Sequence, residues 1–349
     1  MRLRQKSFWS IALVLSVVLF GGAAEAASGC IKGDRKPPYK IGWSDVYLGI
    51  PWMTETRGIM DEAVKDLQGQ GLVKDLTVAN ANADAPTQIQ QIQSMIDSNT
   101  DIILIIAGSA TALNRVIEQA CNKGIAVVNF DSLVTTDKLT AKVYTDPVDW
   151  GRQGAKWLVS QLKGKGDILV LNGVAGVAIS EDRWRGAKEV FDAAKDIHIV
   201  GITNTEHNVG PAQQAVANLL FAHPKIDGIW SQGGAISAGA ILALDKAGVP
   251  MVPITGENYK QFMQMWYDRK FPAWATGQPN WIGALSIYAA VWALQGQDVP
   301  RDIVIPLPSI TNDNLAEYIE RGKNMPDDNY IYPPYSLDLY KKIVKDSRK

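Results

Sequence analysis

From Tyr39 onward, short apolar runs alternate with helical patterns, and no other feature constrains the fold of this chain as strongly. Short continuous apolar runs are typical of parallel strands that helices cover on both faces. Such runs occur at 41–44, 76–79, 102–106 and 126–130, and again at 168–171, 197–202, 228–230 and 251–255. Helical patterns separate them, for example at 86–98, 150–162, 179–194, 210–223 and 236–247. The alternation predicts an α/β fold built on parallel sheets.

The alternation comes in two successive runs of about a hundred residues each, and the second begins near Thr145. A length of 349 residues suggests about two domains, at roughly 150 residues per domain. Two Rossmann-like, doubly wound lobes fit this organisation better than a closed eight-stranded barrel, which is the alternative. The tail after Pro306 is less regular, and only one short helix is predicted there, over 314–321.

The first 26 residues have the pattern of a cleavable export signal. Three basic residues precede the uncharged run 11–20, and Ala24 and Ala26 supply the small side chains that signal peptidase requires. A membrane anchor is the alternative, but this run is too short to span roughly 30 Å of hydrocarbon. Cleavage removes three of 35 basic and one of 36 acidic residues, which leaves a net charge of −3. We therefore predict a signal peptide over 1–26, a periplasmic location and no nucleic-acid partner.

The chain has two cysteines, Cys30 and Cys121, and export permits a disulfide between them. Cys121 ends a helical pattern and Cys30 precedes the first strand, and these two places lie at the same edge of a βαβ sheet. We favour this disulfide over two alternatives. Residues 27–30 loosely resemble a lipobox, so lipidation of Cys30 is one alternative, and a buried free thiol at Cys121 is the other.

Familiar motifs for catalysis and cofactor binding are absent from the sequence. There is no GxGxxG, GxxxxGKS/T, HExxH, GxSxG or paired-cysteine motif. The three histidines, His198, His207 and His223, are too dispersed along the chain to suggest a metal site. The sequence therefore predicts a protein that is not an enzyme and that uses neither a metal nor a cofactor.

Polar and aromatic side chains follow the carboxyl ends of the predicted strands, where open α/β sheets bind their ligands. A sugar or polyol requires aromatic faces for its C–H surfaces and charged or amide groups for its hydroxyls. That mixture is supplied by Trp52, Asp131, Arg183, Asn258 and Gln278. Each of the first four also has a structural alternative. Trp52 could be core, Asp131 and Asn258 could serve turns, and Arg183 could lie on a solvated helix face.

These residues, in this order, resemble the periplasmic sugar-binding proteins of ABC transporters, particularly the ribose-binding type. The resemblance covers most of 39–306 and is carried by segments 39–44, 125–131, 183–186, 218–224 and 277–279. It implies two lobes that hold the ligand between them and are joined by three hinge crossings, near 145–146, 278–279 and 306–307. The lobes would comprise 39–144 with 279–305, and 145–278 with 306–349.

The strand ends and the resemblance together indicate nine candidate ligand contacts: Ser44, Asp45, Trp52, Met53, Asp131, Arg183, His207, Asn258 and Gln278. The resemblance implies that Asp131 binds sugar hydroxyls, that Arg183 is the second lobe's arginine, and that His207 occupies a position that is often aromatic. Three residues depart from the ribose-binding pattern. Ser132 replaces an arginine, Gly233 an asparagine, and Asn258 a common aspartate. We therefore predict a different pentose, a tetrose, a polyol or a related small polar ligand rather than ribose.

The resemblance implies a monomeric, non-enzymatic receptor that captures a small carbohydrate or polyol and delivers it to ABC permease subunits. A periplasmic sensor that presents the same cleft to a chemoreceptor, a sensor kinase or an autoinducer pathway is the alternative. Repressors of the lactose-repressor type share the two lobes, but here an export signal occupies the place of their DNA-binding helices. An exported enzyme that uses Asp131 is the remaining alternative.

Overall fold

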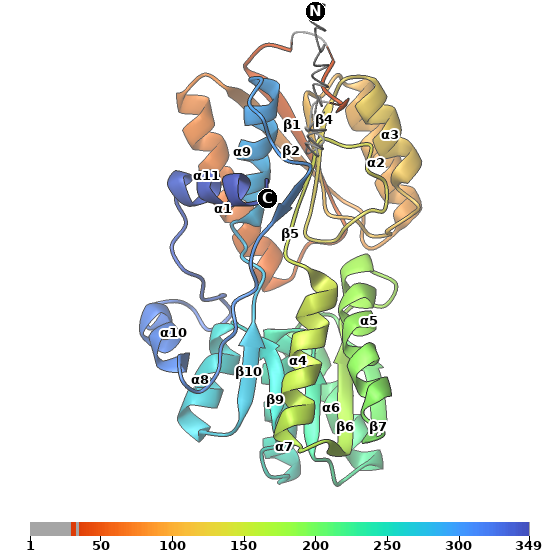
Figure 1. The fold of residues 1–349 in the computed structure, drawn as a ribbon, viewed down its shortest axis with the longest axis vertical. Helices are drawn as coiled ribbons and strands as arrows, with labels where there is room; N and C mark the ends of the chain where they lie inside the picture. Colours follow the sequence, from red (N-terminus) through yellow and green to blue (C-terminus); the bar gives the residue numbers. More distant parts are fainter. Residues whose placement is uncertain (1–28, 33–34, 349) are drawn as a thin grey trace, which may run out of the picture.

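The computed structural model describes residues 29–32 and 35–348, so the predicted signal segment 1–26 lies outside the described residues. The described chain forms two parallel sheets, each with helices on both faces, and the two lobes are stacked end to end in Figure 1. This arrangement confirms the prediction of two doubly wound lobes and excludes the single closed barrel. Within the described ranges, no helix combines the length and the hydropathy needed to cross a membrane.

The first lobe contains a six-stranded sheet in the order β11-β5-β4-β3-β1-β2. Its strands are β1 (Tyr39–Asp45), β2 (Val73–Asn80), β3 (Ile102–Ile105), β4 (Ala126–Phe130), β5 (Ala141–Tyr144) and β11 (Asp302–Val304). Helices α1 (Pro51–Gly69) and α9 (Ile282–Leu294) pack together on one face, and α2 (Ala85–Asp97) and α3 (Asn114–Asn122) cover the other. Because helices cover both faces, β3 and β4 are buried along their whole length, as their continuous apolar runs predict.

The second lobe contains a five-stranded sheet in the order β10-β9-β8-β6-β7. Its strands are β6 (Lys165–Asn172), β7 (Asp196–Asn204), β8 (Gly228–Ser231), β9 (Ile254–Glu257) and β10 (Ala273–Thr276). Its helices are α4 (Pro147–Gln161), α5 (Ala178–Ala193), α6 (Val209–Ala222), α7 (Gly234–Ala247), α8 (Lys260–Arg269) and α10 (Leu315–Gly322). Helices α4 and α5 pack together on one face, and α6 and α7 pack together on the other.

The chain crosses between the lobes after β5, after β10 and after β11. The first crossing leads directly into α4. The Asp146 side chain caps this helix by accepting hydrogen bonds from the N–H groups of Val148 and Asp149, and Pro147 occupies its first turn. Near the third crossing, Ile310 pairs with Ala275 in an antiparallel bridge beside β10. All three crossings lie close to the positions that the resemblance implies.

The tail departs from the predicted division, which assigned 306–349 as one piece to the second lobe. Helix α10 packs on α8 of that lobe, but the chain then returns and α11 (Leu337–Asp346) packs beside β11 of the first lobe. The Tyr340 ring lies 5.6 Å from Trp281 and 5.7 Å from Tyr288, measured between ring centroids. This aromatic packing covers α9, which is apolar on all sides and needs a neighbour there.

Two further expectations concern a strand and the cysteines. The strand predicted over 251–255 is displaced and forms β9 at Ile254–Glu257, because Pro253 has no N–H to donate to a ladder. Cys30 and Cys121 form a disulfide, which confirms the favoured pairing and rules out both alternatives, since each needs a cysteine outside a disulfide. The disulfide joins the segment before β1 to the last turn of α3.

Candidate functional site

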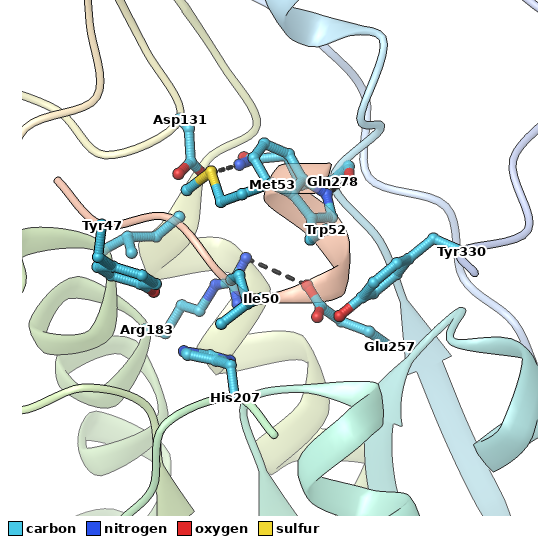
Figure 2. A pocket seen from close by; sticks show the side chains of 11 residues that line it. Tyr47, Ile50, Trp52, Met53, Asp131, Arg183, His207, Glu257, Gln278 and Tyr330 are labelled. Atoms are coloured by element: carbon cyan, nitrogen blue, oxygen red, sulfur yellow. Dashed lines mark hydrogen bonds and ion pairs between the residues drawn. The ribbon is translucent and has the colours of Figure 1, made fainter. Parts of the chain in front are cut away.

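A cavity lies between the lobes at the carboxyl ends of their strands (Figure 2). Its empty space amounts to about 380 Å³, part of which is open to solvent. The lining residues are Tyr47, Ile50, Trp52, Met53, Asp131, Ile179, Arg183, His207, Glu257, Gln278 and Tyr330. In this arrangement of the lobes, the cavity has room for a small ligand only where its buried polar side chains converge.

The first-lobe wall is tied to the hinge through Gln278. The Gln278 side-chain amide donates to an Asp131 oxygen, and its carbonyl oxygen accepts from the Thr145 hydroxyl, so two hinge crossings meet at this one side chain. The backbone carbonyl of Gln278 accepts the indole N–H of Trp52 at 2.9 Å. These contacts fix the Trp52 ring and the Asp131 carboxyl beside each other, as Figure 2 shows.

The second-lobe wall is centred on Arg183, which directly contacts three residues of the same lobe. Its guanidinium lies 3.3 Å from a Glu257 oxygen, donates to the backbone carbonyl of Gln232 at 3.0 Å, and lies 4.5 Å from the ring centroid of Trp150. Arg183 and Glu257 are both about 95 % buried. A buried guanidinium needs such ion-pair, carbonyl and cation–π partners to offset its desolvation.

Burial sets the protonation of the remaining groups. It raises the pKa of Asp131 to about 7, although the Arg183 guanidinium opposes the shift. The pKa of His207 is lowered to about 3, mainly by burial and to a lesser extent by the nearby Arg183 charge. This imidazole is therefore neutral at neutral pH. Burial also raises the pKa of Glu257, again against Arg183. The cavity therefore contains one guanidinium, two carboxyls that burial biases toward neutrality, and neutral hydrogen-bonding groups.

Six of the nine predicted contacts line the cavity: Trp52, Met53, Asp131, Arg183, His207 and Gln278. The other three lie outside its wall. Ser44 is buried beneath α2 and donates to Gln91 at 3.1 Å. Asp45 is also buried. Its pKa is raised, mainly by burial and to a lesser extent by the Asp131 charge. Asn258 donates to the backbone carbonyl of Ile331 at 2.7 Å and thereby fastens the tail to the second lobe.

Three polar lining residues were missed by the sequence prediction. Glu257 directly precedes the predicted Asn258, and successive side chains of a strand point to opposite faces, so an error of one residue exchanges them. Tyr47 stands in the loop just after β1, the strand that ends with the predicted Ser44 and Asp45. Tyr330 comes from the irregular tail, which carries no periodic signal.

The structure also explains one departure from the ribose-binding pattern. A Cβ atom on Gly233 would lie 2.9 Å from Nδ1 of His207, so the glycine leaves the space that the imidazole occupies. The His207 ring thus fills the volume that a side chain at position 233 would take.

Among residues 29–32 and 35–348, no three His, Cys, Asp or Glu side chains cluster as metal ligands do.

Comparison with known proteins gives consistent matches. The sequence profile of the family described as "Periplasmic binding protein domain" matches residues 41–298. The chain is 29% identical to the xylitol-binding protein of Mycolicibacterium smegmatis, over 70% of this chain and 71% of that protein. It is 25% identical to the ribose import binding protein of Bacillus subtilis, over 85% of this chain and 96% of that protein.

A solved structure shares the fold over most of both chains. The ABC transporter solute-binding protein of Thermobispora bispora superimposes with a TM-score of 0.81 at 26% sequence identity. The match covers 89% of this chain and 96% of that one. The tail beyond residue 298 lies outside the region that the family profile matches.

Proposed function

Since this chain belongs to the family of periplasmic binding proteins, we propose that it is an exported receptor of an ABC importer, which captures a small sugar or polyol between its lobes. A membrane permease would then accept the ligand from the closed receptor. The location is periplasmic or extracellular, as the family implies, and we propose that the signal over 1–26 is cleaved to give a periplasmic protein.

The cavity between the lobes is the observation that carries the ligand class. Trp52 and Tyr330 offer aromatic faces, and Arg183, Glu257, Asp131 and Gln278 offer donors and acceptors in a buried space. Hydroxyl-rich ligands require both kinds of group, because their C–H surfaces pack on rings while each desolvated hydroxyl needs a hydrogen-bond partner.

The charge of the cavity supports an uncharged ligand. Its single guanidinium is already paired with Glu257, and a second carboxyl, Asp131, lies nearby. A phosphorylated or acidic sugar would therefore find the one guanidinium of the lining already engaged by Glu257. The relatives named above for xylitol and ribose suggest a ligand of about five carbons, and the small cavity is consistent with that size.

Closure of the lobes would couple capture to recognition by the permease. The ligand contacts come from both lobes, so a bound ligand stabilises the closed arrangement over the open one. One direct contact already joins the lobes at the cavity, since the backbone N–H of Ile179 donates to the Ser132 hydroxyl at 3.2 Å. Ser132 stands where the ribose-binding type that this chain resembles has an arginine, and it thus participates in a lobe-to-lobe contact.

Thermal-shift and calorimetric screening of the chain from residue 27 onward tests the proposal. The panel should contain erythritol, xylitol, D-ribose, D-allose and myo-inositol, with a phosphorylated sugar as the negative control. We expect at least one neutral member to raise the melting temperature and to bind with one-to-one stoichiometry. Trp52→Ala should weaken that binding by about 2 kcal/mol. No shift across the panel would contradict the proposal.

A gene deletion in the source organism separates the importer from a sensor that uses the same cleft. Loss of uptake of the identified ligand is expected for an importer. Retained uptake with a lost transcriptional or chemotactic response would instead assign the receptor to signalling.

A further inference from the structure

The C-terminal segment 325–335 passes from the second lobe to the first and borders the cavity on its way. On the second-lobe side its backbone is held by three residues at the start of α8. The N–H of Ile331 donates to Asn258, and the N–H groups of Lys260 and Gln261 donate to Asn329 and Asp327, all within 3.0 Å. The bond from the Asn258 side chain to Ile331 adds a fourth attachment.

The same segment is held from the first lobe and the hinge. The backbone N–H of Tyr330 donates to a side-chain oxygen of Glu55 in α1 at 2.8 Å. The Tyr332 hydroxyl donates to the backbone carbonyl of Gln278 in the hinge. The Tyr335 hydroxyl donates at 2.7 Å to Glu62, which lies about two turns beyond Glu55 on α1. Residue 330 therefore stands where attachments from both lobes converge.

These attachments place the Tyr330 side chain in the cavity. The side chain is 97 % buried and lines the wall with Trp52 and Glu257. Its ring packs against Tyr259, with 5.2 Å between ring centroids, and stacks on Tyr332 at 6.4 Å. In Figure 2 its phenol oxygen points toward the Glu257 carboxylate, across the cavity from Tyr47. A ring supported on two sides cannot turn away without moving the segment.

We propose that Tyr330 is a ligand-contacting residue that sets the size limit of the site, and that the C-terminal segment exists in part to present it. This inference rests on the proposed function, because it presumes that the cavity binds a sugar or polyol. The ring closes the cavity on the Glu257 side, and the phenol offers one further hydroxyl partner there. The ligand class that follows is a compact polyol or monosaccharide, with no substituent directed toward the tail.

Calorimetry on Tyr330→Ala and Tyr330→Phe tests this assignment, with xylitol, D-ribose, D-allose, myo-inositol and the disaccharide maltose as probes. We expect Tyr330→Ala to bind the ligand that the wild type prefers at least tenfold more weakly. We also expect Tyr330→Ala to gain relative affinity for larger probes. The affinity for the largest bound probe, divided by the affinity for the ligand that the wild type prefers, should rise by tenfold or more. Tyr330→Phe should bind several-fold more weakly and keep the size preference, because only the phenol oxygen is lost.

Tyr335→Phe is the matched control, since it removes a tyrosine hydroxyl from the same segment outside the cavity. Its affinities should stay within twofold of the wild type. If Tyr330→Ala does not fold, Tyr330→Leu provides the same comparison of probe sizes. A uniform loss of affinity with an unchanged ranking of probes would show that Tyr330 only supports the fold, and would overturn the inference. A wild type that binds none of the probes would overturn the proposed function instead, and the inference with it.

Discussion

The two lobes hold their sides of the cavity in different ways. In the second lobe, Arg183 pairs with Glu257, donates to Gln232 and lies over the Trp150 ring, so these three contacts all come from its own lobe. In the first lobe, Trp52 and Asp131 are held through Gln278 of the hinge. The second-lobe wall is thus preorganised, whereas the first-lobe wall depends on the position of the hinge. Preorganised groups lose less freedom on binding.

The disulfide belongs to the first lobe alone, and its removal should have the largest effect on stability. The bond joins residues that are 91 positions apart. Closing a loop of that size is worth about 4–5 kcal/mol in the chain-entropy estimate. We expect a Cys30→Ser, Cys121→Ser double variant to lose about that much free energy of unfolding in denaturant titrations.

Hydrogen exchange shows whether this loss stays in one lobe. Amides of β3 and β4 should lose protection, while those of β6 and β8 in the second lobe should keep it. An equal loss of amide protection in both sheets would mean that the two lobes unfold as one unit. The lobes would then not differ in stability.

Arg183→Ala tests the self-contained wall. The substitution leaves Glu257 buried without its partner, which costs about 3–5 kcal/mol in comparable buried pairs. We expect both a large loss of stability and the loss of measurable ligand binding. The control is Arg185→Ala on the same helix, whose side chain is 61% exposed and pairs with Asp182 three residues earlier. Unchanged stability in Arg183→Ala would show that the cluster is not the fixed half of the site.

The sequence predicts the sheets well and the cavity only in part. Buried parallel strands such as β3 are continuous apolar runs, which need no knowledge of tertiary packing to recognise. Side chains at strand ends are harder to place. Whether Glu257 or Asn258 faces the ligand depends on the pleat at the last residue of β9, and the sequence does not determine it.

The tail could not be predicted from local patterns. Its path depends on contacts with residues far away in the chain, such as the bond from Tyr330 to Glu55. Tyrosine in an irregular segment has no periodicity from which a position could be inferred. For the same reason α11 was assigned to the wrong lobe, since only its packing on α9 and β11 reveals its place.

Asp131→Asn tests the hinge-dependent wall through its pH dependence. The folded state keeps the Asp131 proton to about pH 7, whereas an unfolded aspartate loses it near 3.8. The contribution of Asp131 to the free energy of unfolding therefore falls as pH rises between these values, by at most about 1.4 kcal/mol per pH unit. Asp131→Asn should show a less steep fall over pH 4–7 in urea titrations without ligand.

His207 acts in the opposite direction and provides the control. Its pKa is about 3 when folded and 6.5 when unfolded, so its contribution to stability is lost as pH falls through that range. His207→Asn should therefore steepen the fall that Asp131 causes. Parallel pH profiles for the wild type and Asp131→Asn would show that burial does not hold the Asp131 proton.

Ser132→Ala should have the smallest effect, because it removes one hydrogen bond between the lobes. The Ser132 hydroxyl accepts from Ile179 of the second lobe and donates to Ala107 of its own lobe at 2.6 Å. Such a bond contributes about 1 kcal/mol, and it exists only while the lobes are close. We expect ligand affinity to fall about fivefold. The radius of gyration without ligand, measured by small-angle scattering, should increase. Because Ser132 does not line the cavity, an unchanged radius with weaker binding would place its effect in the fold of the first lobe rather than in lobe closure.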